Sequence, residues 1–195
     1  MIRPDLAAVA AWINPHAKVL DLGCGDGTLL KYLSESGQVS GYGVEIDHVN
    51  ILASLGNGVN VIQRDLEAGL SGFESNSFDF VVLSQTLQAM RNTESIVREM
   101  LRVGRQGIVT FPNFGHWSNR WQILRGVMPV SPDLPYQWYD TPNIHLCTLA
   151  DFEAFCTRLG VKVLQRLVLH RGRAIRTLPN LRGSLAVYRF AANPA

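Results

Sequence analysis

The 195-residue chain is predicted to form one α/β domain on a mostly parallel seven-stranded sheet, with helices on both faces. Three features of the sequence predict this class. Short apolar runs alternate with stretches of helical period, a glycine-rich turn follows the first run, and the last two runs follow each other without a helix. Because parallel neighbours need crossover connections, the first five runs fit βαβ units. The last pair fits an antiparallel hairpin at one edge.

The elements are expected in a regular order along the chain. Helical period begins at Leu6 with Asp5 as its cap, and the sequence Thr148 to Asp151 is a capping box that opens the last long helix. Glycines 37, 58, 104 and 160 act as stop signals. The expected helices cover about residues 6–13, 28–35, 48–55, 93–103 and 148–159. The expected strands cover residues 18–22, 38–46, 59–63, 78–83, 107–111, 161–169 and 184–190.

One segment, residues 112–147, departs from this alternation. It holds five prolines and no long periodic run, and ordinary connections are much shorter. Seven of the 17 aromatic residues of the chain lie between Phe111 and Tyr139. We expect this insertion to form a lid or a pocket wall within the single domain of residues 1–195.

Composition excludes several classes of protein. With 47% apolar and 17% charged residues the chain can bury a core and is not expected to be disordered. No apolar run approaches the length of a membrane span, and the first residues lack the pattern of a signal peptide, so a cytoplasmic protein is expected. Cys24, Cys147 and Cys156 are too few and too scattered for a disulfide framework, and no cluster has the spacing of a metal site.

The net charge of +2 hides an asymmetry along the chain. The last acidic residue is Glu153, and eight Lys or Arg residues follow it, so the first 153 residues carry 10 − 16 = −6. Four of these cations, between Arg171 and Arg182, suggest a phosphate or nucleic-acid patch as one hypothesis. A basic loop is more often a solvated face or a partner contact, and we do not expect nucleic acid to be the ligand.

The glycine-rich turn in the sequence Val19-Leu-Asp-Leu-Gly-Cys-Gly-Asp-Gly27 is the most informative motif. It joins a strand directly to a helix, and open α/β sheets bind ligands at such turns. Its spacing is G-x-G-x-G, with Thr28 where a dinucleotide site has glycine, and no G-K-[ST] follows. The turn therefore favours a nucleoside without phosphates over NAD or a nucleotide.

Acidic residues end the next two strands. Glu45 ends the second strand, twenty residues after Gly25, and its carboxylate could accept both hydroxyls of a ribose. Asp65 ends the third strand, where a carboxylate can accept from an adenine amino group. The carboxyl ends of parallel strands meet at one edge of the sheet, so we expect both acids to lie near the glycine turn.

With this turn and these acids, the sequence resembles the class I S-adenosylmethionine-dependent methyltransferases, which implies a Rossmann-like fold. The resemblance implies that Gly23 and Ser84 meet the methionine part of S-adenosylmethionine or S-adenosylhomocysteine, Glu45 the ribose, and Asp65 with Leu66 the adenine. Ile46 would pack on the adenine. The residues assigned to the cofactor are Asp21, Gly23, Cys24, Gly25, Glu45, Ile46, Asp65, Leu66 and Ser84.

The sequence of the insertion indicates one family among these methyltransferase-like proteins. Its sequences Phe111-Pro-Asn-Phe-Gly-His-Trp117 and Pro129 to His145 are similar to those of the MetW family of methionine-biosynthesis proteins, and the similarity covers nearly the whole chain. It implies a role in methionine synthesis beside a homoserine O-acyltransferase of the MetX type, which such proteins accompany. We therefore favour an accessory subunit that binds the cofactor and docks through the aromatic insertion or the basic tail.

A methyltransferase acting on an unidentified small molecule is the alternative. Methyl transfer needs mainly positioning and desolvation, so no fixed catalytic signature is required. His116 and His145 could serve as a general base, although each could equally hydrogen-bond the backbone of the insertion. Trp117 and Tyr136 are further candidates for substrate or lid contacts, and no catalytic residue is assigned.

Overall fold

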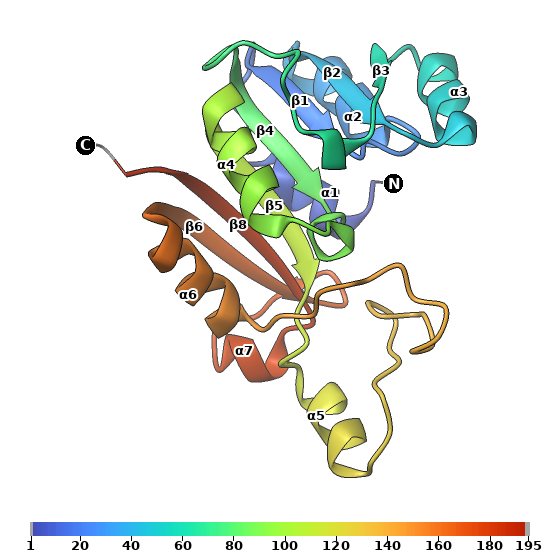
Figure 1. Cartoon of the computed structure of the whole chain (residues 1–195), viewed down its shortest axis with the longest axis vertical. Helices are drawn as coiled ribbons and strands as arrows, with labels where there is room; N and C mark the ends of the chain where they lie inside the picture. Colours follow the sequence, from blue (N-terminus) through green and yellow to red (C-terminus); the bar gives the residue numbers. More distant parts are fainter. Residues whose placement is uncertain (1, 194–195) are drawn as a thin grey trace.

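A mixed sheet of eight strands forms the centre of the computed structural model, which describes residues 2–193 (Figure 1). The strand order is β3-β2-β1-β4-β5-β8-β6-β7. The parallel strands are β1 (Lys18–Leu22), β2 (Ser40–Glu45), β3 (Val61–Gln63), β4 (Phe78–Ser84) and β5 (Gly104–Pro112). The antiparallel strands are β8 (Leu185–Ala192), β6 (Val161–His170) and β7 (Arg173–Ala174). The predicted mostly parallel α/β sheet with its C-terminal hairpin is confirmed.

The sequence predicts seven strands, and the described residues form eight. The additional strand, β7, has two residues, which pair with Leu169 and His170 at the end of β6. A two-residue strand has no alternation of apolar and polar positions, so the sequence pattern does not reveal it.

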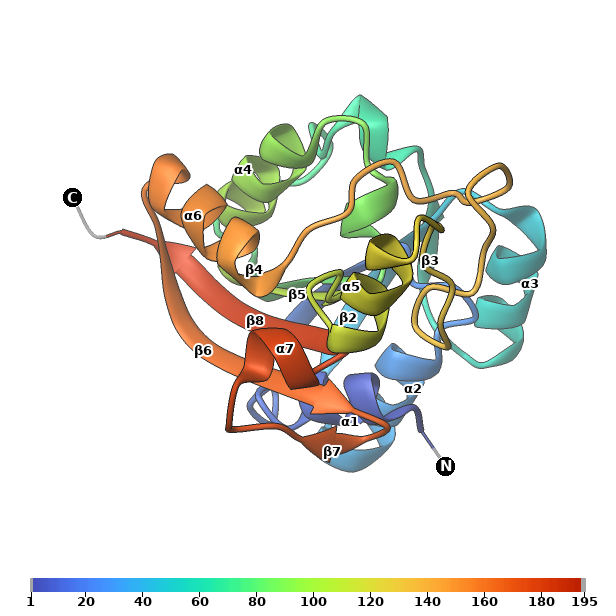
Figure 2. The same ribbon diagram turned by 90° about the horizontal axis from the view of Figure 1, so that it is seen from below.

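Helices cover both faces of the sheet (Figure 2). One apolar cluster contains α4 (Thr93–Val103) and α6 (Leu149–Leu159), and the other contains α1 (Pro4–Ala10) and α2 (Thr28–Gly37). The remaining helical elements are α3 (His48–Gly56), η1 (Leu66–Ala68), η2 (Leu87–Ala89), α5 (Trp117–Leu124) and α7 (Pro179–Arg182). No helix among residues 2–193 is both long and apolar enough to cross a membrane.

Of the two predicted helix caps, the one at Thr148 is present and the one at Asp5 is not. The Thr148 capping box is present in α6: the Thr148 hydroxyl accepts from the Asp151 N–H, and the Asp151 carboxylate accepts from the Thr148 N–H. The predicted Asp5 cap is wrong, because α1 begins at Pro4 with Arg3 as its N-cap. Proline at the first helical position explains this start. Asp5 is buried within the first turn instead.

The insertion of residues 112–147 extends away from the sheet (Figure 1). Its ends meet, since the N–H of Phe114 donates to the C=O of Cys147 at 3.0 Å. It contains the helix α5, which the sequence pattern does not predict. Asn119 is the one described α5 residue that is fully buried, so α5 lacks the inward apolar stripe by which helices are recognised.

Candidate functional site

The glycine turn lies where the strand order of the parallel sheet reverses direction. β1 pairs with β2 on one side and with β4 on the other, and the turn follows β1. In open α/β sheets, ligands bind beyond the carboxyl ends of the strands at this switch point. The fold therefore places the predicted turn at the position where a ligand is expected.

Backbone and packing fix the shape of this turn. Gly23 and Gly25 have φ of +67° and +57°, a region that favours glycine. The N–H groups of Gly23 and Cys24 both donate to the C=O of Val44, which ties the turn to β2. A Cβ at Gly23 would lie 2.8 Å from the Thr86 hydroxyl oxygen, whereas nothing lies within 4 Å of a Cβ at Gly25. Gly23 is thus needed for packing, and Gly25 borders open space.

Glu45 holds the turn through backbone hydrogen bonds. Its Oε2 accepts from the Gly25 N–H at 2.9 Å, and its Oε1 accepts from the N–H groups of Ile46 and Asp47 at 2.8 and 3.0 Å. A carboxylate offers about four lone-pair sites, so about one remains, on Oε2. A ribose hydroxyl could therefore bind Oε2 directly, whereas a second contact at Oε1 would have to replace a backbone bond.

Asp21 is the most unusual group at the turn. Only 3% of the residue is exposed, and its Oδ1 has no hydrogen-bond partner among the described residues. Burial raises the pKa of this carboxyl to about 7, the Arg3 guanidinium opposes the shift, and the Glu45 carboxylate adds to it. An unpartnered buried acceptor of this kind can receive a hydrogen bond from a cationic or N–H group of a ligand.

A cavity of about 320 Å³ opens beside Asp21. Five of the nine residues predicted for the cofactor line it, namely Asp21, Gly23, Cys24, Gly25 and Ser84. Burial, with the Asp21 carboxylate as the next cause, raises the pKa of the Cys24 thiol to about 12, so this thiol is neutral. The volume falls within the roughly 300 to 1,000 Å³ of ligand pockets.

Six further residues that were not predicted for the cofactor line this cavity, namely Arg3, Leu6, Asp26, Thr28, Leu29 and Asn50. Arg3 and Leu6 come from the N-terminal helix region, which is anchored across the sheet edge through Asp5. The buried Asp5 carboxylate accepts from Arg3 at 2.8 Å and from the Gln85 side chain at 3.0 Å. Gln85 follows β4, so this contact closes α1 over the turn. The predicted helix at the N-terminus gave no indication of where it packs.

Four predicted cofactor residues do not line this cavity. Glu45 contacts it only through Gly25, and Ile46 is 58% exposed beyond the end of β2. Asp65 is exposed and caps η1 by accepting from the Glu67 N–H at 2.9 Å. Leu66 packs against the apolar cluster under α4 and α6.

The predicted residues of the insertion are spread over separate places. His116 is buried, caps α5 and stacks on His170 with ring centroids 4.8 Å apart. Burial lowers the pKa of His116, and His170 lowers it further. Trp117 and Tyr136 are exposed to solvent. The Nε2 atom of His145 lies 3.3 Å from the C=O of Arg91. None of the four lines the cavity at the glycine turn.

Comparison with known families identifies the chain. The family model described as "Methionine biosynthesis protein MetW" matches residues 3–190. The chain belongs to the MetW family. It is also 36% identical to a bifunctional methionine biosynthesis protein MetXA/MetW of Rhodopirellula baltica, over 97% of this chain and 33% of that protein. The chain thus spans about a third of this relative, and its family role lies in methionine biosynthesis.

Solved structures similar to this MetW-family chain include S-adenosylmethionine-dependent methyltransferases. One, from Thermotoga maritima, has a TM-score of 0.69 and 19% identity, over 97% of this chain and 88% of the other. Another, from Mesorhizobium loti, has a TM-score of 0.71 and 14% identity, over 96% and 97%. At such identities the likeness establishes the methyltransferase fold alone.

The residues at the turn fit the cofactor of this fold in three respects. Asp21 offers a buried acceptor without a partner, Gly25 borders open space, and Glu45 keeps lone-pair capacity on Oε2. The Asp21 oxygen suits a cationic or N–H group of a ligand, and the free site on Glu45 Oε2 suits a hydroxyl. These features are compatible with a nucleoside that carries an amino group.

Proposed function

We propose that this protein binds S-adenosylmethionine or S-adenosylhomocysteine at the glycine turn and is an accessory subunit of a MetX-type homoserine O-acyltransferase. The observation that supports this partner is the Rhodopirellula relative, whose name joins MetXA and MetW in one protein. Joining two modules in one chain raises their effective concentration, which is useful when they work together. In this protein the MetW module would contact a partner of the same kind.

The cofactor would be held by the turn and the ends of β1 and β2. When bound, S-adenosylmethionine supplies a sulfonium cation with a transferable methyl group. Asp21 would accept from the amino group or face the cation, and the remaining site of Glu45 would accept one ribose hydroxyl. Ser84, whose hydroxyl lies 3.0 Å from that of Thr110, would border the methionine part.

The surface suited to the partner is the outer face of α5 together with Leu181 of α7. We call it the α5 face and define it as Trp117, Arg120, Trp121, Leu124 and Leu181. Trp117, Trp121 and Leu124 are 56%, 54% and 76% exposed and follow the i, i+4, i+7 spacing of one helix side. Contiguous exposed apolar surface marks interaction sites, and Trp and Arg are frequent anchors there. An accessory subunit needs such a surface, and the aromatic insertion provides it.

Cofactor binding is tested by calorimetric titration of the purified protein with S-adenosylmethionine and S-adenosylhomocysteine. We expect both to bind, and we expect Glu45→Ala to weaken binding about tenfold to a hundredfold, because a charge-assisted hydrogen bond contributes roughly 1.5 to 3 kcal/mol. No heat of binding at millimolar ligand would contradict the cofactor site and leave the partner role to be judged by itself.

Docking is tested by titrating the protein into the homoserine O-acyltransferase of the same organism. We expect a complex with the wild-type chain and at least a tenfold loss of affinity in the double variant Trp117→Ala, Trp121→Ala. The matched control is Leu52→Ala, Leu55→Ala on α3, whose side chains are also exposed and apolar. Failure of the wild-type chain to bind would refute the partner, whereas equal losses in both variants would refute only the α5 face.

A further inference from the structure

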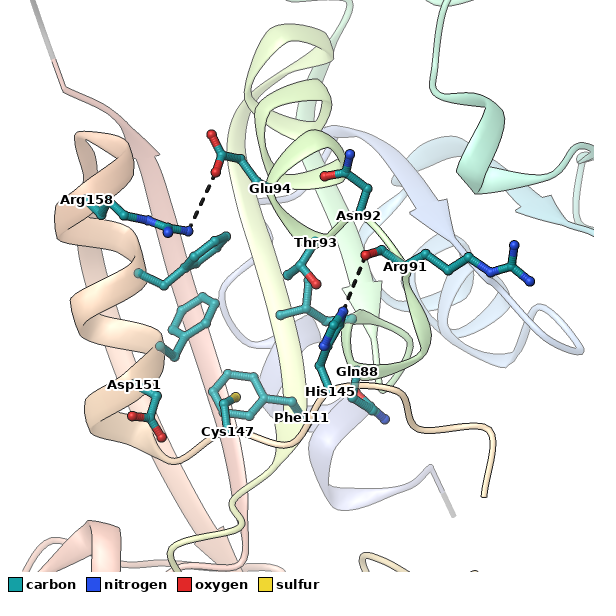
Figure 3. A pocket seen from close by; sticks show the side chains of 13 residues that line it. Gln88, Arg91, Asn92, Thr93, Glu94, Phe111, His145, Cys147, Asp151 and Arg158 are labelled. Atoms are coloured by element: carbon teal, nitrogen blue, oxygen red, sulfur yellow. Dashed lines mark hydrogen bonds and ion pairs between the residues drawn. The ribbon is translucent and has the colours of Figure 1, made fainter. Parts of the chain in front are cut away.

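A second cavity, of about 340 Å³, lies between α4 and α6 (Figure 3). It shares no lining residue with the cavity at the glycine turn. Phe111 near the carboxyl end of β5 forms its floor, and residues 145–147 pass beside it where the insertion returns to the fold. It is therefore a separate space on the face of the sheet covered by α4 and α6.

The α6 side of this cavity is aromatic. Phe152 and Phe155 project from α6, and Phe152 packs on Phe111 with ring centroids 4.9 Å apart. Burial, with Asp151 as the second cause, raises the pKa of the Cys147 thiol to about 12, so this wall residue is neutral as well. Such a surface binds an apolar chain, since removing apolar area from water is favourable.

The opposite side offers polar atoms without partners. The Thr93 hydroxyl and the Gln88 side-chain oxygen are buried and have no hydrogen-bond partner within the described part of the chain. Gln88 is 9% exposed, and its amide nitrogen already donates to the C=O of Gln85 at 2.8 Å. Buried polar atoms are nearly always paired, so these two atoms make the wall opposite α6 polar.

Charges of both signs meet at the mouth. Arg158 on α6 lies 3.6 Å from Glu94 on α4, and Figure 3 shows this pair bridging the two helices. The contact is long and exposed and adds little stability, so a ligand can replace it at small cost. The other charged lining groups are engaged or turned away. Asp151 bonds Thr148 in the capping box, and the side chain of Arg91 points out of the cavity.

We propose that this cavity binds a zwitterionic amino acid with an unbranched apolar side chain. The side chain would lie among the Phe rings and the carboxylate would bind Arg158. The ammonium group would face Glu94, which lies beside Arg158 at the mouth. A fatty acid would bring no cation to replace Arg158 beside Glu94, and an alkyl amine would leave Arg158 without a partner.

The test is calorimetric titration with L-norleucine, beside hexanoate and hexylamine, which each lack one of its charged groups. We expect L-norleucine to bind and each of the other two to bind about tenfold more weakly or worse, the effect of losing a charge-assisted hydrogen bond. Absence of L-norleucine binding at millimolar concentration would overturn the proposal, as would equal affinity for all three compounds.

Arg158→Gln separates a direct contact from a structural effect. It should weaken L-norleucine about tenfold and leave hexylamine unchanged, because hexylamine has no carboxylate to lose. Arg98→Gln is the matched control, since Arg98 pairs with the same Glu94 at 2.9 Å but does not line the cavity. Equal weakening of both ligands by Arg158→Gln, or the same loss in Arg98→Gln, would overturn the assignment. Binding at the glycine turn plays no part in these measurements.

Discussion

Asp21 is a carboxyl group that folding moves out of water without a full set of partners. Its pKa rises from 3.8 to about 7 mainly through burial. The folded state therefore holds a proton between about pH 4 and pH 7 that the unfolded state has lost. Stability from this group is present below the unfolded pKa and is lost as pH rises through about 7.

Asp21→Asn tests this behaviour. The amide carries no charge, so the variant should be more stable than the wild type at pH 8, by on the order of 1 to 3 kcal/mol, and the difference should vanish near pH 4. Urea unfolding at both pH values measures it. Asp26→Asn is the control in the same turn. Its pKa is lowered, chiefly by the Thr28 hydroxyl, so the sign at neutral pH should reverse. A pH-independent effect of Asp21→Asn would contradict the raised pKa.

At the scale of residues, the ends of the strands predict which residues lie close together. Asp21, Gly23, Gly25 and Ser84 reach one cavity because they lie at the carboxyl ends of neighbouring parallel strands. Asp65 does not reach it, because the chain turns into η1 directly after β3. Arg3 enters the cavity through the packing of α1, a tertiary contact that periodicity does not encode.

Among the elements, α6 begins at the predicted capping box and also supports other parts of the structure. Its capping box satisfies N–H groups of the first turn, and its body carries the aromatic wall of the second cavity. Glu153 on the same helix also accepts from the Tyr188 hydroxyl of β8 at 2.8 Å. Loss of the cap should therefore destabilise α6, which carries both the aromatic wall of the second cavity and the hydrogen bond from Tyr188 to Glu153.

Thr148→Ala should lower the free energy of unfolding by about 1 kcal/mol, the usual cost of removing an N-cap hydroxyl. Thr157→Ala is the control within the same helix, because its exposed hydroxyl bonds only the C=O of Glu153. We expect its effect to stay within about 0.5 kcal/mol. Urea denaturation compares the two variants, and similar losses in both would mean that the cap contributes nothing special.

The elements also show where sequence patterns fail. The predicted helix of residues 93–103 matches α4, whose buried side chains Ile96, Val97, Met100 and Val103 repeat at helical spacing. The helix α5 was missed because its apolar residues face solvent. Pattern analysis detects buried apolar faces, and α5 has no such face.

Across the whole molecule, the insertion is tied to the fold at its base and at further points. The N–H groups of Ile144 and His145 donate to the C=O of Gln88, and His116 stacks on His170. The Phe114 to Cys147 hydrogen bond brings its two ends together, and the N–H of Asn113 donates to the C=O of Ser184 beside them. The entropic cost of closing a loop changes slowly with its length, so shortening this segment changes that cost only slightly.

Replacing residues 115–146 by a short Gly-Ser linker should therefore leave a folded sheet that still binds S-adenosylhomocysteine. Binding to the acyltransferase should fall below detection, because the α5 face is removed. Far-UV circular dichroism and calorimetry with each ligand provide the measurements. A variant that is unfolded would show that the insertion is part of the core, and a variant that still binds the partner would place the interface elsewhere.

The segment of residues 84–88 borders both cavities. Ser84 lines the cavity at the glycine turn, and Gln88 lines the cavity between α4 and α6. Gln85 lies between them: its side-chain amide donates to Asp5 of α1, and its C=O accepts from the side-chain amide of Gln88. If a ligand in one cavity changes the affinity of the other cavity for its ligand, the factor is the same in both directions. This shared segment is where such a coupling between the two proposed ligands would be carried.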